Sequence, residues 1–495
     1  MSRFARPIGA VAQTLCFMNR HPLFVASFAL CTFVSACVSR AADAPIDPFA
    51  AEKRTGPVKP SIYEPKRGAY LGAALDTSQL GGATPAQLTA QMRDFNRTAG
   101  RPHALYMHFL QFPNLQGEFG TWESDANGWI PASKFAAATD AAGATPILTL
   151  EPFAPQLMLD WRPGSKAYEA TKAFAVGAGK WGKPLFIRYA HEMNGSWYPW
   201  AEWTDRNQNM TRDPEEDTGF TADKYRQSYR NVASMFRKYA PNAALIWCPN
   251  SGLLGGGKRD VFRPWYPGDD VVDWVGIDIY ERGWTMPMPG AKLWGGQFGH
   301  NLTHDMTDDS NTPQNESVNF YQLYGQWKKK PIMICETGST LSYRTDLTVP
   351  QRAQITRDWK IGYWNNAEYG WLQGVYGTSG YKGQKFIEPL DVAFPMVKAV
   401  VWFQIAKREY IPAQKAAGQF AWFNNEWADY RIGGGVEEGK VAPFGKQELD
   451  VYRALTGNSY FLSKVSAAPV VAKKAAKTRV AAKRAAVKRK VVNGG

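Results

Sequence analysis

The stretch LFIRYAHE, residues 185–192, decides the fold of this chain. It is a mostly apolar run without strict alternation of polar and apolar residues, and it ends on His191 and Glu192. Strands that are buried on both faces of a parallel sheet have this pattern. Seven more runs of the same kind occur at residues 70–75, 103–109, 146–151, 245–249, 274–280, 332–336 and 399–404. We therefore predict eight buried strands.

Helical stretches fill most of the gaps between these strands. They are predicted at residues 85–99, 131–142, 166–180, 222–239, 318–329, 350–371 and 446–455. Thr84, followed by Pro85, and Thr221 are favourable residues at which a helix begins. Strands that alternate with helices predict an α/β fold, a (β/α)8 TIM barrel, with a doubly wound open sheet as the alternative. A barrel requires its functional groups to lie at the carboxyl ends of strands.

Acidic residues stand at the ends of four predicted strands: Glu151, Glu192, Asp278 and Glu336. Hydrolysis of a glycosidic bond needs two carboxyl groups, because one protonates the leaving oxygen while the other attacks the sugar or activates water. Each glutamate taken alone could also be a salt-bridged strand cap. Glu192 and Glu336 together are the predicted catalytic pair.

The residues around Glu192 support this interpretation. The sequence RYAHEMNGSWYPW, residues 188–200, places Arg188, His191 and Asn194 beside several aromatic rings. Charged and amide groups can orient a carboxylate, and flat aromatic faces stack on sugars.

Two other interpretations of this region and its surroundings are excluded by spacing. A zinc-binding HExxH helix would need a second histidine where Gly195 stands. The glycine-rich stretch GLLGGGK, residues 252–258, is followed by Arg259 instead of the Ser or Thr that a phosphate-binding loop requires. We therefore expect no metal and no organic cofactor.

The segments 188–200, 273–280 and 331–338 resemble glycoside hydrolase family 26, whose best-known members are endo-β-1,4-mannanases. The resemblance extends over roughly residues 68–455 and depends most on the HEMNG sequence followed downstream by a strand-ending glutamate. It implies a (β/α)8 barrel that cleaves β-linked polysaccharide.

The resemblance also implies a role for individual residues. Glu192 would be the general acid/base and Glu336 the nucleophile, with His191 beside them and Tyr280 hydrogen-bonded to the nucleophile. The two aromatic positions implied for the substrate cleft are Trp197 and, as the floor under the sugar at the cleavage point, Trp402.

Departures from the mannanase pattern leave the sugar open. Glu336 is followed by Thr337 and Gly338 where Phe-Gly is common in the family, and the aromatic run after Gly195 also differs. The family includes enzymes that cut mixed-linkage β-glucan and β-1,3-xylan, and relatives linked to exopolysaccharide. An endo-β-1,4-mannanase is the first expectation, and a mixed-linkage β-glucanase or an exopolysaccharide-processing glycosidase is the alternative.

The expected mechanism is a retaining double displacement. Glu336 attacks the anomeric carbon, Glu192 protonates the departing oxygen, and Glu192 then takes a proton from the incoming water. This requires carboxyl groups about 5 to 5.5 Å apart. His191, Arg188 and Tyr280 should orient the pair, and Asn194 should contact the sugar 2-hydroxyl or support Glu192.

The formal net charge of +14 suggests a nucleic-acid binder, but the charge lies at the two ends of the chain. Residues 1–42 carry four basic residues and no acidic one, and residues 464–495 carry ten basic residues and no acidic one. The part between them has as many basic as acidic residues. We therefore expect no specific nucleic-acid binding by the folded part.

Residues 1–42 are predicted to be an export signal, because an apolar run follows Arg20 and is too short for a comfortable membrane span. The sequence VSAC, which ends at Cys37, resembles a bacterial lipobox, in which the cysteine is lipidated. Cleavage near Ala42 or Ala44 is the alternative. We expect an exported protein that is periplasmic, envelope-anchored or extracellular. The other two cysteines of note, Cys248 and Cys335, lie in apolar runs and are predicted to be buried thiols.

The chain is divided into a linker at residues 43–67, a barrel at 68–460 and a disordered basic tail at 464–495. The tail is rich in Lys, Arg, Ala and Val and has no residues with which to build a core. It is either simply solvated or binds an anionic surface such as lipid head groups, acidic polysaccharide or cell-wall polymer.

A different class of function remains open. A non-catalytic polysaccharide-binding or biosynthesis-associated protein could keep the barrel cleft. Such a protein would be expected to have lost one of the two carboxylates, whereas both are present here.

Overall fold

The computed structural model describes thirteen segments: residues 52–55, 59–77, 80–207, 212–251, 262–281, 297–303, 318–339, 370–381, 388–409, 426–432, 436–437, 440–441 and 445–466. The predicted export segment with Cys37, the glycine-rich stretch 252–258, residues 350–369 and the tail from residue 467 lie outside these segments.

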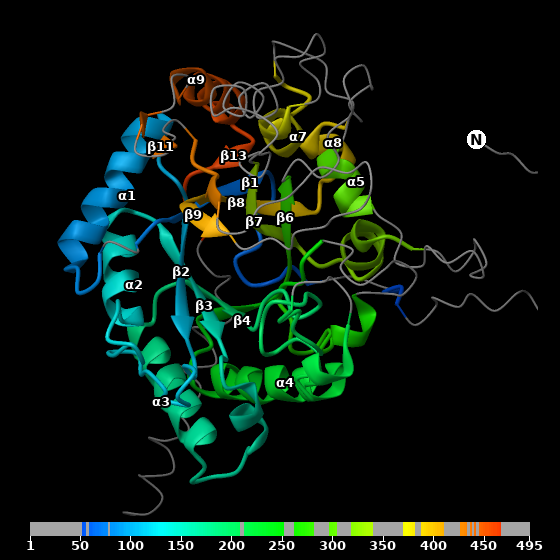
Figure 1. Ribbon diagram of the computed structural model, residues 1–495. Coiled ribbons are helices and arrows are strands. Elements are labelled where there is room, and N and C mark those ends of the chain that lie inside the picture. Colours follow the sequence, from blue (N-terminus) through cyan, green and yellow to red (C-terminus); the bar gives the residue numbers. More distant parts are fainter. Residues whose placement is uncertain are drawn as a thin grey trace, which may run out of the picture. The chain divides into compact units, whose positions relative to one another are not determined.

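Eight parallel strands close into a barrel, seen end-on in Figure 1. Each strand pairs with the next along the chain, and the last pairs with the first, so the sheet has no open edge between them. This closure confirms the (β/α)8 barrel and excludes a doubly wound open sheet. The strands are β1 (Ala69–Leu75), β2 (Leu105–Gln111), β3 (Thr145–Glu151), β4 (Leu185–Tyr189), β5 (Ala243–Trp247), β6 (Trp274–Glu281), β7 (Ile332–Ser339) and β8 (Val397–Gln404).

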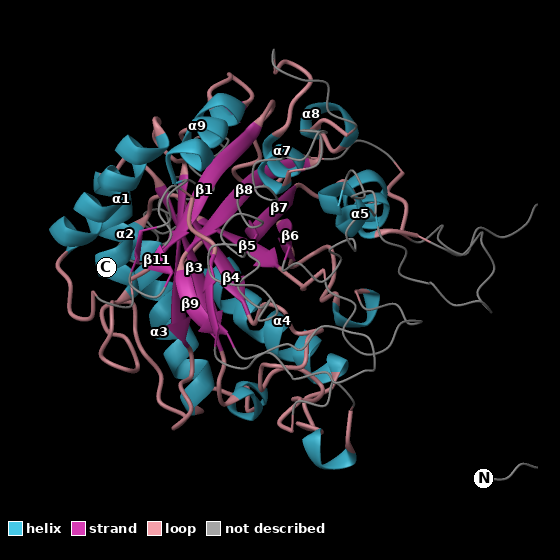
Figure 2. Ribbon diagram, turned by 45° about the horizontal axis from the view of Figure 1, so that its top comes forward, coloured by secondary structure: helices cyan, strands magenta, loops and turns pink. Residues whose placement is uncertain are grey.

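Helices lie outside the strands, as Figure 2 shows. Thr84 and Thr221 cap the first turns of α1 and α4, as expected, by accepting backbone N–H groups. The α-helices are α1 (Pro85–Ala99), α2 (Ala132–Ala141), α3 (Lys166–Trp181), α4 (Ala222–Tyr239), α5 (Gln297–Thr303), α7 (Trp371–Tyr376), α8 (Leu390–Ala393) and α9 (Gly445–Thr456). The 3-10 helices are η1 (Pro155–Leu159), η2 (Pro214–Glu216) and η3 (Arg263–Trp265). A π-helix, η5 (Tyr321–Trp327), lies in the predicted helix 318–329.

Five short strands follow β8 among the described residues. The last of them, β13 (Phe461–Leu462), pairs parallel with the start of β1. β9 (Ala406–Glu409) pairs antiparallel with β10 (Glu426–Asp429), and β11 (Val436–Glu437) pairs antiparallel with β12 (Lys440–Val441). Among the described residues, no helix combines the length and the apolar character that a membrane span requires.

The core consists of two apolar layers, because residues along each strand point alternately into the barrel and out toward the helices. In β4, Phe186 belongs to the interior cluster, whereas Ile187 belongs to the cluster between strands and helices. In β8, Val401 and Phe403 point inward and Trp402 points outward. This alternation decides which strand residues can reach the site.

The amino-terminal end of the barrel is closed by chain that flanks the strands. The Tyr63 ring packs against Phe186 with centroids 5.6 Å apart, and Trp274 donates a hydrogen bond to the Ile62 carbonyl at 2.8 Å. From the other flank, the Ser466 N–H donates to the Tyr70 hydroxyl at 3.0 Å. The folded part therefore extends into the predicted linker 43–67 and into the first residues of the predicted tail 464–495.

β7 carries an irregularity that the sequence pattern does not reveal. Its pairing register shifts against β6 between Ile277 and Asp278, and against β8 between Ile334 and Thr337. Strict alternation would send Cys335 inward and Glu336 outward. Because of the bulge, Glu336 points inward like Cys335 and reaches the mouth of the barrel. β-Bulges commonly redirect a functional side chain in this way.

Candidate active site

Glu192 lies just beyond the end of β4 and is aimed by an unusual backbone. Ala190 and Glu192 both have left-handed φ angles, 48° and 52°. Such angles are uncommon for residues other than glycine and need support from surrounding structure. The Ala190 N–H donates to the Leu150 carbonyl at 2.9 Å and the Glu192 N–H donates to the Cys248 carbonyl at 2.8 Å. These bonds to β3 and to the end of β5 fix the turn that carries the carboxyl group.

Two side chains hold the Glu192 carboxyl group. Trp197 donates its indole N–H to Oε2 at 2.7 Å, and Asn250 donates its amide to Oε1 at 2.5 Å. Asn194 in turn exchanges two hydrogen bonds of 2.8 Å with the backbone of Asn250. Asn194 therefore contacts Asn250, the residue that holds Glu192.

Glu336 is held by different partners. Arg188 from β4 donates Nη2 to Oε1 at 2.5 Å, and Tyr280 from β6 donates its hydroxyl to Oε2 at 2.6 Å. Burial, and then the nearby Glu336 charge, raise the pKa of Tyr280 well above its ordinary value, so its hydroxyl keeps the proton that it donates. Both partners are hydrogen-bond donors, and together they fix the orientation of the Glu336 carboxyl group.

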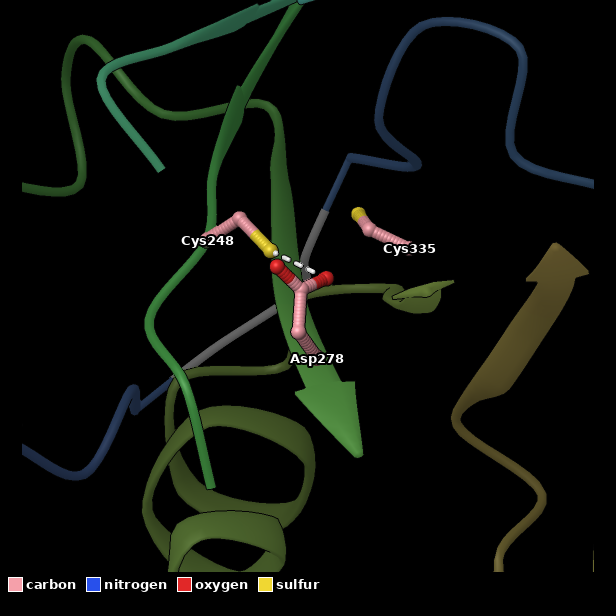
Figure 3. A group of neighbouring side chains, drawn as sticks. All are labelled: Cys248, Asp278 and Cys335. Atoms are coloured by element: carbon pink, nitrogen blue, oxygen red, sulfur yellow. Dashed lines mark hydrogen bonds between the residues drawn. The ribbon is translucent and has the colours of Figure 1, made fainter. Parts of the chain in front are cut away.

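Arg188 is itself buried, and its guanidinium group is oriented by Asp278 and Met107. The same Nη2 contacts Asp278 Oδ2 at 3.1 Å, and Nη1 approaches the Met107 sulfur at 3.3 Å. Figure 3 shows Asp278 beside Cys248 and Cys335, with the Cys248 thiol pointing at the carboxylate. That thiol donates to Asp278 Oδ1 at 3.2 Å. Both cysteines are buried free thiols, as predicted.

His191 lies between the aromatic residues and Glu336. Its Nε2 is 3.1 Å from the Tyr198 hydroxyl and 3.8 Å from Glu336 Oε1, and its backbone carbonyl accepts the Trp200 indole N–H at 2.6 Å. Burial, assisted by Arg188, lowers the pKa of His191 well below its ordinary value. The ring is therefore neutral at physiological pH and takes part in hydrogen bonding, not in an ion pair.

A resident metal does not fit this donor set. In the part of the chain that the structure describes, two groups of side chains have ligand atoms within 4.8 Å of one another: Cys248, Asp278 and Cys335, and His191, Asp278 and Glu336. Both include Asp278, which already pairs with the Arg188 guanidinium, and that fixed positive charge opposes a second cation. Burial also raises the pKa of the Cys248 thiol well above its ordinary value, whereas metals bind the thiolate.

A cavity of about 560 Å³ opens at this end of the barrel and includes Glu336 and Tyr198. It extends past the ends of β2 and β3, where Gln111 and Glu151 lie opposite each other in register. Phe403 of β8 contributes the aromatic surface from that strand. A cavity of this size accommodates a sugar unit or more.

The structure differs from the sequence-based expectation at Trp402. Its side chain is fully buried in the layer between strands and helices, 6.2 Å from the Tyr376 ring, and donates to the Tyr430 carbonyl at 2.8 Å. It does not line the cavity described above; the inward-pointing Phe403 next to it does. Strand alternation is the physical reason, because neighbouring residues of β8 point to opposite faces.

Sequence reasoning also missed some residues of the site. Asn250 follows β5 and could have been found by the strand-end rule, since the run 245–249 ends directly before it. Glu151 was recognised as a strand end but not as part of the cavity. Trp129 lies in the loop after β2, where no pattern in the sequence marks it.

The fold and the site together define a (β/α)8 barrel with carboxylates from separate strands gathered at its carboxyl end, the place where barrel enzymes have their active sites. The model of glycosyl hydrolase family 26 matches residues 178–290. The chain is thus similar to this family over residues 178–290, which include two of the segments that carry the resemblance drawn from the sequence, 188–200 and 273–280. The match includes Glu192 and Tyr280 and ends before Glu336.

Several characterised proteins are similar to parts of this chain. Endoglucanase H of Acetivibrio thermocellus is 29% identical over 195 residues, which are 38% of this chain and 19% of that protein. Beta-1,3-xylanase TXYA of a Vibrio species is 30% identical over 110 residues, 21% of this chain and 18% of that protein. A mannan endo-1,4-beta-mannosidase of Bifidobacterium adolescentis is 28% identical over 98 residues, 20% of this chain and 8% of that protein. The chain thus spans less than a fifth of the length of each.

Proposed function

We propose that this protein is a retaining glycoside hydrolase that cleaves β-linked polysaccharide, with Glu336 as nucleophile and Glu192 as general acid/base. The observation that carries the proposal is the unequal environment of the two carboxyl groups. Glu336 accepts hydrogen bonds from a guanidinium and a phenol, whereas Glu192 accepts hydrogen bonds from an indole and an amide. Different environments are what assign different roles to two carboxyl groups in one site.

In the first step, a Glu336 oxygen forms a bond to the anomeric carbon as the bond from that carbon to the leaving oxygen breaks. The leaving oxygen takes the proton of Glu192, and a glycosyl ester of Glu336 results. In the second step, water gives a proton to Glu192 while its oxygen attacks the anomeric carbon, and Glu336 is released as a carboxylate. Arg188 and Tyr280 stabilise Glu336 before the first step and after the second.

The first candidate substrate is β-1,4-mannan. The mannosidase similarity and the family 26 similarity support it, and the similarities to an endoglucanase and a β-1,3-xylanase keep mixed-linkage β-glucan and β-1,3-xylan in the set to be tested. An exported location, a lipid on Cys37 and adhesion of the basic tail to an anionic envelope or acidic polysaccharide belong to the same proposal. Electrostatic adhesion would weaken as salt increases.

The test is reducing-end release from mannan, mixed-linkage β-glucan and β-1,3-xylan by the parent chain and by Glu336→Ala and Glu192→Gln. We expect both substitutions to lower kcat by at least about a thousandfold, because each removes a covalent or proton-transfer role. Azide should restore turnover to Glu336→Ala and give a glycosyl azide. Equal release by Glu336→Ala and the parent chain would show that another site, or no site, performs the cleavage.

A further inference from the structure

The cavity continues well beyond Glu336. On the side of β1 to β3 it is lined by Gln111 at the end of β2 and by Asn127 and Trp129 in the loop that follows. None of these residues has a part in the proposed double displacement. Their arrangement shows a surface that is ordered for binding.

A relay of amides fixes the orientation of Gln111. The backbone N–H groups of Gln116 and Glu118 donate to Asn114 Oδ1 at 3.1 and 2.8 Å. The Asn114 amide nitrogen must then donate, and it does so to Asn127 Oδ1 at 3.0 Å. The Asn127 amide nitrogen donates in turn to Gln111 Oε1 at 2.9 Å. With its oxygen occupied, Gln111 presents its NH2 group, a hydrogen-bond donor, to the cavity.

The same loop presents an aromatic face. Asp125 Oδ1 accepts the backbone N–H groups of Asn127 and Trp129, both at 2.9 Å, and so fixes the turn that carries the indole. Trp129 is 39% exposed, and Trp197, beside Glu192, is 40% exposed. Exposed indoles therefore lie both beside Glu192 and at the far part of the cavity. A flat apolar face beside a fixed donor suits a sugar ring with its hydroxyl groups.

The charges around the cavity indicate which sugars fit. Its charged lining consists of the carboxylates of Asp76, Asp125 and Glu336, against one amino group, that of Lys407. The other ionisable lining residues, Glu151, His108 and Tyr198, are neutral near pH 7, because burial raises the pKa of Glu151 to about 8, lowers that of His108 to about 4 and raises that of Tyr198. A sugar acid would bring a further negative charge to this predominantly acidic surface, and like charges repel. The lining therefore favours a neutral sugar.

The direction in which the polysaccharide lies across the site follows from the position at which Glu192 is held. Trp197, which follows β4, and Asn250, which follows β5, keep its carboxyl group on the side of these two strands, so the leaving group departs on that side. The cavity lies on the side of β1 to β3 and contains Glu336. It therefore receives the part of the polysaccharide that becomes attached to Glu336.

We propose that Gln111, Asn127 and Trp129 form a subsite for a neutral sugar unit on the glycone side, beyond the unit that is cleaved. The Trp129 indole stacks on the sugar ring and the Gln111 amide donates to a hydroxyl group. The direction assigned to this subsite rests on the proposed hydrolase function, whereas the binding of sugar to Trp129 and Gln111 does not.

The first experiment compares substrates of different length. Trp129→Ala should lower kcat/KM about five- to twelvefold on the hexasaccharide of whichever panel glycan is cut, since an aromatic contact of about 1 to 1.5 kcal/mol corresponds to such a factor. It should leave kcat/KM unchanged on a short aryl β-glycoside that does not reach the loop. Gln111→Glu, which replaces the donor by an acceptor, should also act only on the long substrate. Leu115→Ala is the matched control, because Leu115 is 66% exposed in the same loop and does not line the cavity.

The second experiment measures binding without turnover. Calorimetry with Glu192→Gln and β-1,4-mannohexaose, a mixed-linkage glucan hexasaccharide and β-1,3-xylohexaose should show binding that Trp129→Ala weakens and Leu115→Ala does not. If the parent chain cuts no glycan but this binding occurs, the hydrolase function fails and the sugar site stands. If the parent chain is active and Trp129→Ala behaves like Leu115→Ala at every length, the subsite is refuted. Binding of oligogalacturonate that depends on Trp129 would overturn the neutral-sugar assignment.

Discussion

At the scale of single residues, the site is organised by what each carboxyl group contacts. Strand-end position predicted Glu192, Glu336 and His191, because a barrel directs such residues toward its mouth, and the polar residues beside Glu192 added Arg188. It did not predict that Asn250 would be a direct partner of Glu192. Side-chain partners depend on distances between separate loops, and a pattern along one strand does not contain them.

Asn250 should be necessary for efficient proton transfer. Asn250→Ala removes the amide that holds Glu192 Oε1, so the carboxyl group loses its fixed orientation toward the leaving oxygen. We expect kcat to fall about tenfold or more with little change in KM. Steady-state kinetics on the panel glycan that is cut would measure it. Asn231→Ala on α4 is the control, because that amide bonds only the remote Met158 carbonyl; an equal fall in both variants would contradict a positioning role.

Glu151 should make the stability of the protein fall as the pH rises from the acidic into the neutral range. Burial, partly offset by Arg188, raises the pKa of Glu151 from 4.5 to about 8. Between these values the unfolded chain loses a proton that the folded protein keeps, so stability falls as the pH rises from 4.5 toward 8. Glu151→Gln cannot ionise. We expect its advantage in Tm over the parent chain to grow from pH 5 to pH 8, and a difference independent of pH would contradict the shifted pKa.

At the scale of elements, the alternation of strands and helices was predictable, whereas the bulge in β7 was not. A run such as residues 332–336 shows that a strand is buried, but its register depends on the two strands that pair with it. The same limitation applies to Trp402. Its position near the end of β8 was recognised, but its direction follows from the inward positions of Val401 and Phe403.

Gly276 in β6 is where the two buried thiols and the strands of the site meet. A methyl group there would lie 2.6 Å from the Cys335 sulfur and 2.8 Å from Cys248 Cβ, closer than such atoms approach. We expect Gly276→Ala to destabilise the protein by about 1 to 3 kcal/mol through overpacking. It should also lower kcat, since Cys335 directly precedes Glu336. Chemical denaturation and kinetics would measure the two effects.

Gly81→Ala is the matched control for this prediction. A Cβ at Gly81 meets no atom within 4 Å. Its unfolding midpoint should stay within experimental error of the parent chain or rise slightly. If Gly276→Ala is as stable as Gly81→Ala, the packing around the thiols is looser than the structure shows.

At the scale of the whole molecule, buried histidines should make the barrel sensitive to acid. His103 joins α1 to α9 by contacts of its ring nitrogens with Asn96 Oδ1 at 2.9 Å and with the Tyr452 hydroxyl at 2.8 Å. Burial, assisted by Arg101, lowers its pKa to about 3, and burial lowers that of His108 to about 4. The folded protein therefore keeps both rings neutral under conditions in which the unfolded chain protonates them.

This difference in bound protons makes the stability of the folded protein depend on pH. Because the unfolded chain binds more protons below pH 6.5, stability should fall with decreasing pH from 6.5 toward the folded pKa values, by about 1.4 kcal/mol per pH unit for each ring. His103→Gln removes one of these contributions. The free energy of unfolding, measured between pH 7 and pH 4.5, should fall less steeply in the variant than in the parent chain. Parallel curves would contradict the assignment.

The closed end of the barrel has a consequence for any attachment to a surface. Ile62 and Ser466, from the two flanks of the strands, both contact residues at the end opposite to Glu192 and Glu336. Attachment to a surface through either of these segments would hold the protein by the amino-terminal end of the barrel. The opposite end, with Glu192 and Glu336, would then face the solvent. Long chains could then thread across the site without colliding with the support, and an immobilised preparation coupled through either flank should keep the turnover of the free protein.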